Sequence, residues 1–304
     1  IVFGDWSSDV CSSDLIFAFL GPNGAGKSTT ISMAATQLRP TSGIIKLFGN
    51  DISIYTKLAR KRIGICPQEL VFYENLTVME NLIFFGKMHN RLGKKLKQYA
   101  ELLIAHTGLG EKTNTLASKL SGGMKRRLNL IIALVHDPDF LFLDEPTAGL
   151  DPQTRRLIWE FLLDLKKKGK TIFLTTHYMD EADFLSDRVA IIDHGKIIAL
   201  DSPFDLKRKY SEGDVIEFKF KEPDEMVLAA IGERMTRETN TILKDFTHIE
   251  EDNLFRIALK EGLTKISLLL ELLHSINLHI SDMNVKANSL ENVFLNLTGR
   301  RLRN

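Results

Sequence analysis

The sequence contains only two cysteines, Cys11 and Cys66, in 304 residues. They lie far apart and lack the spacing of a metal-binding pair, so neither a disulfide framework nor a zinc site is expected. Such a low cysteine content is typical of a protein from a reducing, cytosolic compartment.

Long apolar segments are also missing. The longest apolar run, residues 128–135, is interrupted by Asn129 and is much shorter than the roughly 18 residues that a membrane-spanning helix needs. No charged segment precedes a long apolar one near the N-terminus, so no secretory signal is predicted. If the protein serves a membrane, we expect the spanning part to lie on another chain.

An excess of charge of either sign is absent as well. Forty basic residues stand against 39 acidic ones, which gives a formal net charge of +1. This balance supplies no overall field that would attract nucleic acid or anionic lipid, and we expect no nucleic-acid partner. The length is sufficient for two domains, each with its own core.

Residues 16–200 alternate short apolar strands with helical stretches, which is typical of an α/β core around a mostly parallel sheet. Between Thr77 and Val135 the strand pattern stops and helical periodicity begins, with Thr77 and Glu80 spaced as a capping box. We therefore expect a helical insert at about residues 77–135 within an α/β domain at residues 16–212. The expected central strands are residues 16–20, 63–66, 140–143, 171–175 and 189–192.

A change of pattern near Asp214 predicts a second domain at residues 213–304. Apolar and charged residues alternate there as in a half-buried strand. The expected order is strand, helix (223–235), strand (241–247), strand (254–259), helix (264–276) and strand (278–285). This is the split βαβ, ferredoxin-like order. A closing helix with apolar residues at 290, 293, 294 and 297 is expected to have Asn288 as its N-cap.

Residues 21–28, Gly-Pro-Asn-Gly-Ala-Gly-Lys-Ser, match the phosphate-loop pattern between an apolar strand and a helix. Glycines let backbone N–H groups point at phosphate oxygens, and the helix adds its positive end. We expect Lys27 to neutralise the β- and γ-phosphates and Ser28 to bind Mg²⁺. The structural alternative is a glycine-rich turn before a helix. The candidate nucleotide-binding residues are Gly21, Pro22, Asn23, Gly24, Ala25, Gly26, Lys27, Ser28 and Thr29.

Residues 141–145, Leu-Phe-Leu-Asp-Glu, form an apolar strand that ends in two carboxylates. The carboxyl edge of such a sheet is where nucleotides bind. We expect Asp144 to help hold Mg²⁺ and Glu145 to polarise the attacking water. Alone, this pattern is more often a buried strand that leads into a solvated turn. The guanine motif of GTPases and the His-Arg-Asp loop of kinases are both missing, which favours ATP.

A third segment, Leu-Ser-Gly-Gly-Met at residues 120–124, begins a helix. Ser121 can cap that helix, and the free N–H groups of its first turn form an anion site together with Gly122 and Gly123. Because the phosphate loop already serves the chain's own nucleotide, a second phosphate site suggests a nucleotide supplied by another subunit.

Taken with these motifs, the order of the following segments resembles the ABC ATPase family over residues 16–205: Asp144-Glu-Pro-Thr147, Gly149-Leu-Asp151 and Thr176-His177. The resemblance implies a P-loop ABC-type α/β ATPase core with a helical subdomain insert, followed by the smaller α+β, ferredoxin-like C-terminal domain.

The resemblance also implies roles for three further residues. Gln68 is similar to the glutamine that touches Mg²⁺ and water and couples to the membrane subunit. Asp151 is similar to the residue that crosses the dimer interface, and His177 to the switch histidine that hydrogen-bonds the γ-phosphate. A lone histidine at a strand end is otherwise more often structural. In the implied head-to-tail dimer, residues 121–123 of one subunit cover the ATP of the other.

Residues 287–299 resemble the C-terminal ending of ATP-binding subunits in bacterial drug, sodium or polysaccharide-type exporters. The resemblance implies a dimeric ATPase, peripheral on the cytoplasmic face of the cell membrane, that powers export through a membrane-spanning permease subunit on a separate chain. One alternative is a soluble ABC ATPase that acts on ribosomes or DNA. A non-hydrolysing binding module is a third reading, which Glu145 and His177 argue against.

Residues 1–15 differ from the rest of the chain, because Ser-Ser-Asp-Val-Cys at residues 7–11 is nearly repeated at residues 12–16. In the family, paired strands and an adenine-stacking aromatic residue come before the phosphate loop, whereas only residues 16–20 resemble that region here. We expect this segment to be disordered or non-native and the first strands to be missing or replaced. The alternative is a mobile natural N-terminus.

Overall fold

The computed structural model describes residues 14–211, 213–220, 246–249, 254–259, 280–286 and 288–299, together with residues 266, 267, 270, 271 and 274. The chain divides into two compact units between Pro203 and Phe204. This division falls earlier than residue 213 because helix α8 (Pro203–Tyr210) is tied to residues near the end of the chain. Asn288 Nδ2 donates to the carbonyl of Lys207 at 3.0 Å, and Asn296 Nδ2 to that of Tyr210 at 3.1 Å.

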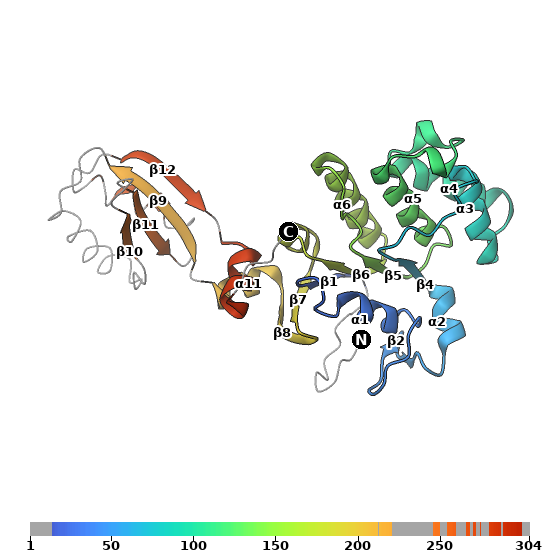
Figure 1. The fold of residues 1–304 in the computed structure, drawn as a ribbon, viewed down its shortest axis with the longest axis horizontal. Coiled ribbons are helices and arrows are strands. Elements are labelled where there is room, and N and C mark those ends of the chain that lie inside the picture. Colours follow the sequence, from blue (N-terminus) through green and yellow to red (C-terminus); the bar gives the residue numbers. More distant parts are fainter. Residues whose placement is uncertain are drawn as a thin grey trace. The chain divides into compact units, whose positions relative to one another are not determined.

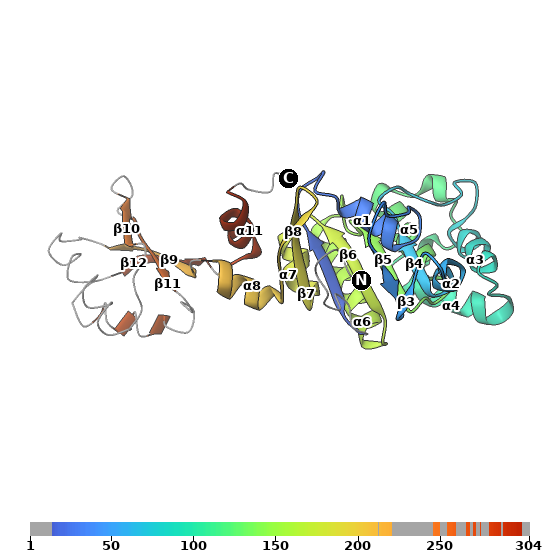
Figure 2. The same cartoon turned by 90° about the horizontal axis from the view of Figure 1, so that it is seen from below.

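A six-stranded sheet in the order β4-β5-β6-β1-β7-β8 forms the centre of the first unit (Figures 1 and 2). Its strands are β1 (Ile16–Leu20), β4 (Ile63–Cys66), β5 (Phe140–Asp144), β6 (Thr171–Thr176), β7 (Arg188–Asp193) and β8 (Lys196–Asp201). The first five strands of this order are parallel, and β8 pairs antiparallel with β7. The central strands predicted from the sequence are therefore confirmed.

The sequence analysis did not predict β8. His194 and Gly195 connect β7 to β8, and both have a positive φ, 47° and 74°. A two-residue connection with two positive φ angles matches the twist of a β-hairpin. The unpredicted strand thus extends β7 into a hairpin at one edge of the sheet.

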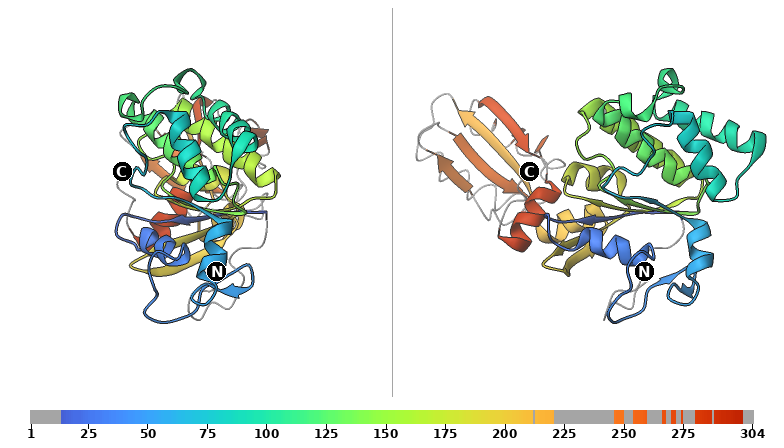
Figure 3. Two further views of the ribbon diagram at one scale, coloured as in Figure 1. Left: turned by 90° about the vertical axis from the view of Figure 1, so that its right-hand side faces the viewer. Right: turned by 45° about the vertical axis from the view of Figure 1, so that its right-hand side comes forward.

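Both faces of the sheet are covered, which explains why its parallel strands are mainly apolar rather than alternating. On one face, Phe17, Phe142 and Phe173 share a buried cluster with Ile31 of helix α1 (Lys27–Ala34). The small hairpin of β2 (Lys46–Leu47) and β3 (Asn50–Asp51) adds Leu47 to the same cluster. Helices α3 to α6 lie on the opposite face (Figures 1 and 3).

The predicted helical insert consists of α3 (Val78–Met88), α4 (Gly93–His106) and α5 (Gly122–Leu134), with 3-10 turns at Gly110–Lys112 and Ala117–Lys119. It lies toward the β4 edge of the sheet (Figure 2). Thr77 Oγ1 accepts from the N–H of Glu80 at 3.2 Å, and Glu80 Oε2 accepts from that of Thr77 at 2.8 Å. The predicted capping box is confirmed.

Three further helices complete the first unit: α2 (Thr56–Arg62), α6 (Pro152–Lys167) and α7 (Met179–Leu185). Helix α6 ends in lysines and is followed by Gly169 with φ of +81°, a conformation that favours glycine after a helix. Among the helices that the structure describes, none has both the length and the apolarity needed to cross a bilayer.

The second unit contains a four-stranded antiparallel sheet in the order β10-β11-β9-β12. The strands are β9 (Asp214–Phe220), β10 (Phe246–Ile249), β11 (Leu254–Leu259) and β12 (Ile280–Lys286). Their order and directions are those of a split βαβ arrangement. The first expected helix, residues 223–235, lies outside the described residues, as does most of the second, so the ferredoxin-like fold stays a prediction.

Helix α11 (Leu290–Thr298) has a different N-cap from the predicted one. Ser289 Oγ accepts from the N–H of Asn292 at 3.3 Å, so Ser289 is the cap. The prediction of Asn288 was wrong because its side chain is directed elsewhere: Asn288 Nδ2 donates to the carbonyl of Lys207. Leu290, Val293 and Phe294 are buried as the helical spacing predicted.

The predictions for residues 1–13 lie outside the described residues. At the end of the segment that we expected to be atypical, Leu15 is only 7% exposed. The carbonyl of Leu15 accepts from the N–H of Ile172 at 2.9 Å, and the N–H of Asp14 donates to Thr171 Oγ1 at 3.2 Å. Pairing with β6 therefore begins before Ile16.

Candidate nucleotide-binding site

The predicted phosphate loop lies between β1 and α1, as the motif requires. Gly24 and Gly26 have φ angles of +81° and +100°, which other residues rarely adopt. A Cβ atom on Gly21 would lie 2.3 Å from the carbonyl oxygen of Ile192, so a side chain is excluded there. The loop folds back on itself through a bond from the N–H of Ala25 to the carbonyl of Pro22 at 3.2 Å. Backbone conformation or close packing thus requires glycine at three positions of the loop.

The ammonium group of Lys27 lies inside this loop. Lys27 Nζ donates to the carbonyls of Gly21 at 2.9 Å and Pro22 at 3.2 Å and is 3.5 Å from Glu145 Oε1. The side chain is 5% exposed, and this burial lowers the pKa of Lys27, against the opposing effect of the Glu145 carboxylate. The protein therefore places a desolvated cation where a phosphate would need its charge neutralised.

Asp144 and Glu145 lie at the carboxyl end of β5, and both are buried. Glu145 has a φ of +48°, a left-handed conformation that costs an acidic residue roughly 1–3 kcal/mol. Thr175 of the neighbouring strand β6 stabilises this conformation. The carbonyl and the Oγ1 of Thr175 both accept from the N–H of Glu145, each at 3.1 Å. Thr175 Oγ1 also donates to Asp144 Oδ1. The sequence analysis did not identify Thr175.

His177 follows β6 and completes a cluster of predicted residues. Its Nδ1 lies 3.1 Å from Glu145 Oε1, the oxygen that also faces Lys27. The three side chains follow β1, β5 and β6, which are neighbours in the sheet. The structure thus brings together the predicted phosphate-binding lysine, the predicted catalytic carboxylate and the predicted switch histidine.

Three other candidates have oxygen atoms that suit Mg²⁺. Ser28 is exposed at the start of α1, Gln68 is exposed after β4, and Asp144 ends β5. Hydroxyl, amide and carboxylate oxygens are the ligands that Mg²⁺ prefers. The residues present therefore fit the ion, and their joint coordination of it stays a prediction.

The remaining candidates lie apart from this cluster. Ser121 caps α5 through its Oγ, which accepts from the N–H of Met124 at 3.4 Å, and a Cβ on Gly122 would meet open space. Asp151 caps α6, where hydrogen bonds from Thr154 hold the pKa of its carboxyl below the usual value. Within the part of the chain that the structure describes, no hydrogen bond or ion pair joins these residues to Lys27, Glu145 or His177.

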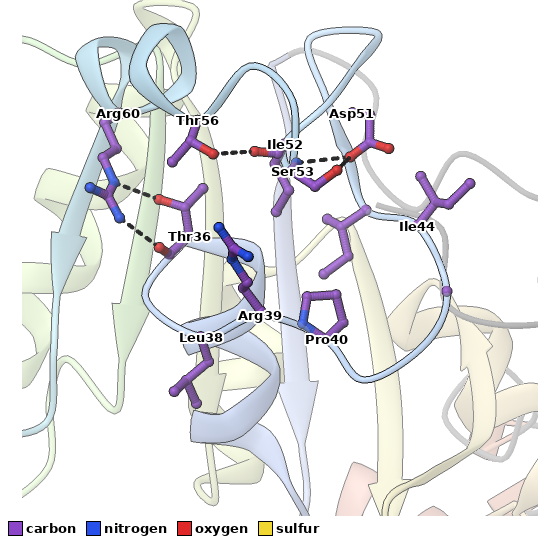
Figure 4. Close-up of a pocket in the computed structure, with 12 residues that line it drawn as sticks. Thr36, Leu38, Arg39, Pro40, Ile44, Asp51, Ile52, Ser53, Thr56 and Arg60 are labelled. Carbon is purple, nitrogen blue, oxygen red and sulfur yellow. Dashed lines mark hydrogen bonds between the residues drawn. The ribbon is translucent and has the colours of Figure 1, made fainter.

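A separate cavity of about 160 Å³ lies beyond the end of α1 (Figure 4). Arg60 donates to Thr36 Oγ1 at 2.9 Å and to its carbonyl at 2.8 Å, and Thr56 Oγ1 donates to the carbonyl of Ile52 at 2.6 Å. None of the candidate site residues lines this cavity, so it is distinct from the phosphate loop.

Comparison with known proteins agrees with this geometry. The sequence pattern of the ABC transporter family matches residues 9–148. A linearmycin resistance ATP-binding protein of Bacillus subtilis is 39% identical over 295 residues, which cover 94% of this chain and 90% of that protein. The chain belongs to the ABC transporter family.

Two further similarities support the ABC assignment. A Nod factor export ATP-binding protein of a Rhizobium strain is 38% identical over 288 residues, covering 94% of this chain and 88% of that protein. A solved dimeric structure of an ATP-binding cassette in a post-hydrolysis state, bound to ADP and Pi, has a TM-score of 0.58 at 25% identity, covering 63% of this chain and 86% of that one. The predicted family, the ATPase activity and the α/β ATPase fold are confirmed.

The structure also links the candidate site through a residue that the sequence analysis missed. Arg126 of α5 is buried, and its guanidinium group donates to carbonyl oxygens in two separate loops. The acceptors are the carbonyls of Pro67, Gln68, Asp144, Glu145 and Pro146. One side chain thus joins the helix that begins at Ser121 to the loops that carry Gln68 and Glu145. The sequence does not single it out, because it is the middle of three consecutive basic residues, Lys125, Arg126 and Arg127, at the start of α5.

Proposed function

We propose that two copies of this chain bind two ATP molecules head to tail and hydrolyse them to drive export through a separate membrane-spanning chain. The observation that carries the proposal is the position of Glu145, whose Oε1 lies between Lys27 Nζ and His177 Nδ1 at 3.5 and 3.1 Å. A buried carboxylate between a phosphate-binding lysine and a histidine is suited to orient water beside a γ-phosphate.

Each member of the cluster has a distinct role in this proposal. Lys27 binds the β- and γ-phosphate oxygens and exchanges its contact with Glu145 for them. Glu145 accepts a hydrogen bond from the attacking water, and His177 donates one to the γ-phosphate. Ser28, Gln68 and Asp144 would hold Mg²⁺, which would neutralise negative charge on the β- and γ-phosphates. Catalysis depends on positioning and on charges fixed in a dry site.

A second copy supplies the other side of each ATP. The exposed N-terminus of α5 offers unpaired N–H groups and Ser121 to an anion, and the open space at Gly122 allows close approach of a phosphate. Asp151 is exposed at the start of α6, where it can reach across to the partner copy. The similarity to a dimeric ATP-binding cassette supports this arrangement.

An apolar groove supports a membrane partner. A cavity of about 380 Å³ lies between the helical insert and the sheet, next to the loop that carries Gln68. Ile65, Val71 and Phe85 line it. We propose that a cytoplasmic segment of the permease binds here, which places the ATPase on the inner face of the membrane. The linearmycin resistance and Nod factor export relatives favour an exporter over the ribosome or DNA alternative.

Glu145→Gln tests the catalytic role. The variant keeps the size of the side chain but loses the negative charge that polarises water. We expect ATP to bind while turnover falls roughly 10²–10⁴-fold, the usual contribution of general acid–base catalysis. The protein should accumulate as a nucleotide-bound dimer in size-exclusion chromatography. Glu160→Gln, on the exposed face of α6, is the matched control and should hydrolyse ATP normally. Normal hydrolysis by Glu145→Gln would reject the role.

Mixing two inactive variants tests the shared sites. Lys27→Ala removes the phosphate-binding ammonium, and Ser121→Arg blocks the partner-facing end of α5. Each variant should be inactive alone, whereas the heterodimer retains one site with both halves intact. A mixture that forms heterodimers, shown by two affinity tags, yet regains no activity would contradict the head-to-tail arrangement.

A further inference from the structure

One buried carboxylate joins the loop after Glu145 to the helix after His177. Glu181 lies in α7 and is 0% exposed. Its Oε1 accepts from Thr147 Oγ1 at 2.7 Å and from Trp159 Nε1 at 3.0 Å. Thr147 belongs to the connection between β5 and α6, and Trp159 belongs to α6. Three segments of the chain therefore meet at a single oxygen atom.

Backbone hydrogen bonds within the loop between β5 and α6 connect Thr147 to the residues on both sides of it. The N–H of Ala148 donates to the carbonyl of Glu145 at 3.2 Å, and the N–H of Leu150 to the carbonyl of Thr147 at 3.2 Å. Thr147 is fully buried. A hydrogen bond to its side chain thus restrains the backbone of Glu145 on one side and the approach to Asp151 on the other.

Helix α7 restrains His177 in the same way. The N–H of Tyr178 donates to Thr176 Oγ1 at 2.9 Å, and that of Ala182 to the carbonyl of Tyr178 at 3.2 Å. The segment that carries His177 is therefore continuous with the helix that carries Glu181. Together with the contact between His177 and Glu145, these bonds close a ring: Glu145, Thr147, Glu181, α7 and His177.

The chemistry of Glu181 indicates more than the filling of space. A carboxylate carries a large desolvation cost when it is buried, whereas an apolar side chain of similar size would pack without that cost. The burial raises the pKa of Glu181. Hydrogen bonding by the side chains of Thr176, Thr147 and Trp159 opposes this rise. All three side chains are neutral, so the carboxylate acts as a shared acceptor that holds them in place rather than as half of an ion pair.

We propose that Glu181 is a positioning residue for ATP hydrolysis. Through Thr147 it fixes the loop that begins at Glu145 against the helix that follows His177, and so holds the Glu145 carboxylate and the His177 imidazole at contact distance. The inference rests on the proposed catalytic roles of these two residues. The hydrogen bond from Trp159 positions the Glu181 carboxylate but makes no contact with the loop between β5 and α6.

The test compares variants of Thr147 that differ by one hydroxyl group. Thr147→Val keeps the shape but cannot donate to Glu181, and Thr147→Ser keeps the hydroxyl. We expect Thr147→Val to lower kcat about tenfold or more, with the KM for ATP within about twofold, because misplaced catalytic groups affect chemistry more than binding. The single variants Thr147→Ser and Glu181→Gln should each retain most of the wild-type rate, since both preserve a hydroxyl donor at residue 147 and an oxygen acceptor at residue 181.

A second comparison separates positioning from stability. In a Glu145→Gln background, Thr147→Val should lower the residual rate by less than twofold, because residues that act through one another are not additive. Trp159→Phe serves as the stability control: it removes a donor to Glu181 and should lower the melting temperature at least as much as Thr147→Val, with a smaller loss of kcat.

The outcomes distinguish this inference from the proposed function. Normal hydrolysis by Glu145→Gln would reject the proposed function itself. An inactive Glu145→Gln together with a Thr147→Val of normal kcat would overturn only the inference. A loss of kcat that follows the melting temperature equally in Thr147→Val and Trp159→Phe would overturn it too, as would full additivity with Glu145→Gln.

Discussion

Replacing Arg126 with lysine keeps the positive charge but removes the planar group that reaches two loops. The guanidinium nitrogens Nε, Nη1 and Nη2 all donate to carbonyl oxygens, among them Gln68 at 2.6 Å and Asp144 at 2.7 Å. An ammonium group has three donors at a single point, whereas arginine has five in a fork. Lysine at this position therefore leaves at least two carbonyls without their partner.

The loss of stability can be calculated from these two unpaired carbonyls. A hydrogen bond to a charged group contributes about 1.5–3 kcal/mol, and a buried acceptor left unpaired costs about 1–3 kcal/mol. Loss of two such bonds predicts a destabilisation of roughly 3–6 kcal/mol. A unit of this size loses about 2–4 °C in melting temperature for each kcal/mol. We therefore expect Arg126→Lys to melt roughly 6 °C lower or more and to hydrolyse ATP at least about tenfold more slowly, because Gln68 and Glu145 are no longer held together.

Differential scanning calorimetry and a steady-state phosphate-release assay measure both quantities. Arg127→Lys is the matched control. Arg127 Nη1 donates to the carbonyls of two adjacent residues, Thr107 at 2.8 Å and Gly108 at 3.3 Å, which a single ammonium group can reach. The control should melt within about 3 °C of the wild type. Equal melting temperatures and rates for Arg126→Lys and the wild type would refute the bridging role.

Two further predictions concern stability. Gly64→Ala should lower the free energy of unfolding by about 1–3 kcal/mol, because the added Cβ would lie 2.2 Å from the carbonyl oxygen of Ala133 and 2.8 Å from Pro138 Cγ. Thermal unfolding measures this change, and Gly110→Ala, whose added Cβ would meet open space, is the control. Burial and the stacked ring of His89 lower the pKa of His136 to about 4. Because only the unfolded chain then takes up this proton as the pH falls from about 6.5 toward 4, stability should decline by up to about 1.4 kcal/mol per pH unit. Urea unfolding between pH 7 and pH 5 should show the decline, and a slope unchanged in His136→Gln would contradict this assignment.

The sequence predicted the sheet where burial alone decides the pattern. Five strands are mainly apolar because both faces of the sheet are covered, and their short length between turn residues distinguishes them from buried helices. Strand β8 was missed because Lys196–Asp201 mixes exposed and buried residues at a sheet edge. The N-cap of α11 was misplaced by one residue because Asn288 and Ser289 are both good capping residues. The contact of the Asn288 side chain with the carbonyl of Lys207, distant in the sequence, distinguishes them in the structure.

In the site, too, local sequence patterns were predictable and contacts between distant residues were not. Lys27, Glu145 and His177 were predictable because each sits in a motif whose local spacing is tied to its chemistry. Arg126 and Glu181 were not, because their partners are backbone carbonyls and side chains far away in the sequence. A buried polar residue on an apolar helix shows that a partner exists but does not say which one.

The strand order explains why Glu145 needs an unusual backbone conformation. In the order β5-β6-β1, the strand before Glu145 is separated by β6 from the strand that leads into the phosphate loop. Glu145 must therefore reach across the end of β6 to lie 3.5 Å from Lys27, and β6 itself supplies His177 along that path. A positive φ of 48° turns the chain immediately after β5, and Thr175 on β6 stabilises that turn by accepting hydrogen bonds from the N–H of Glu145. The middle strand thus contributes both the support beneath Glu145 and its histidine partner, so the geometry for hydrolysis depends on β6 as much as on the strands that carry the two motifs.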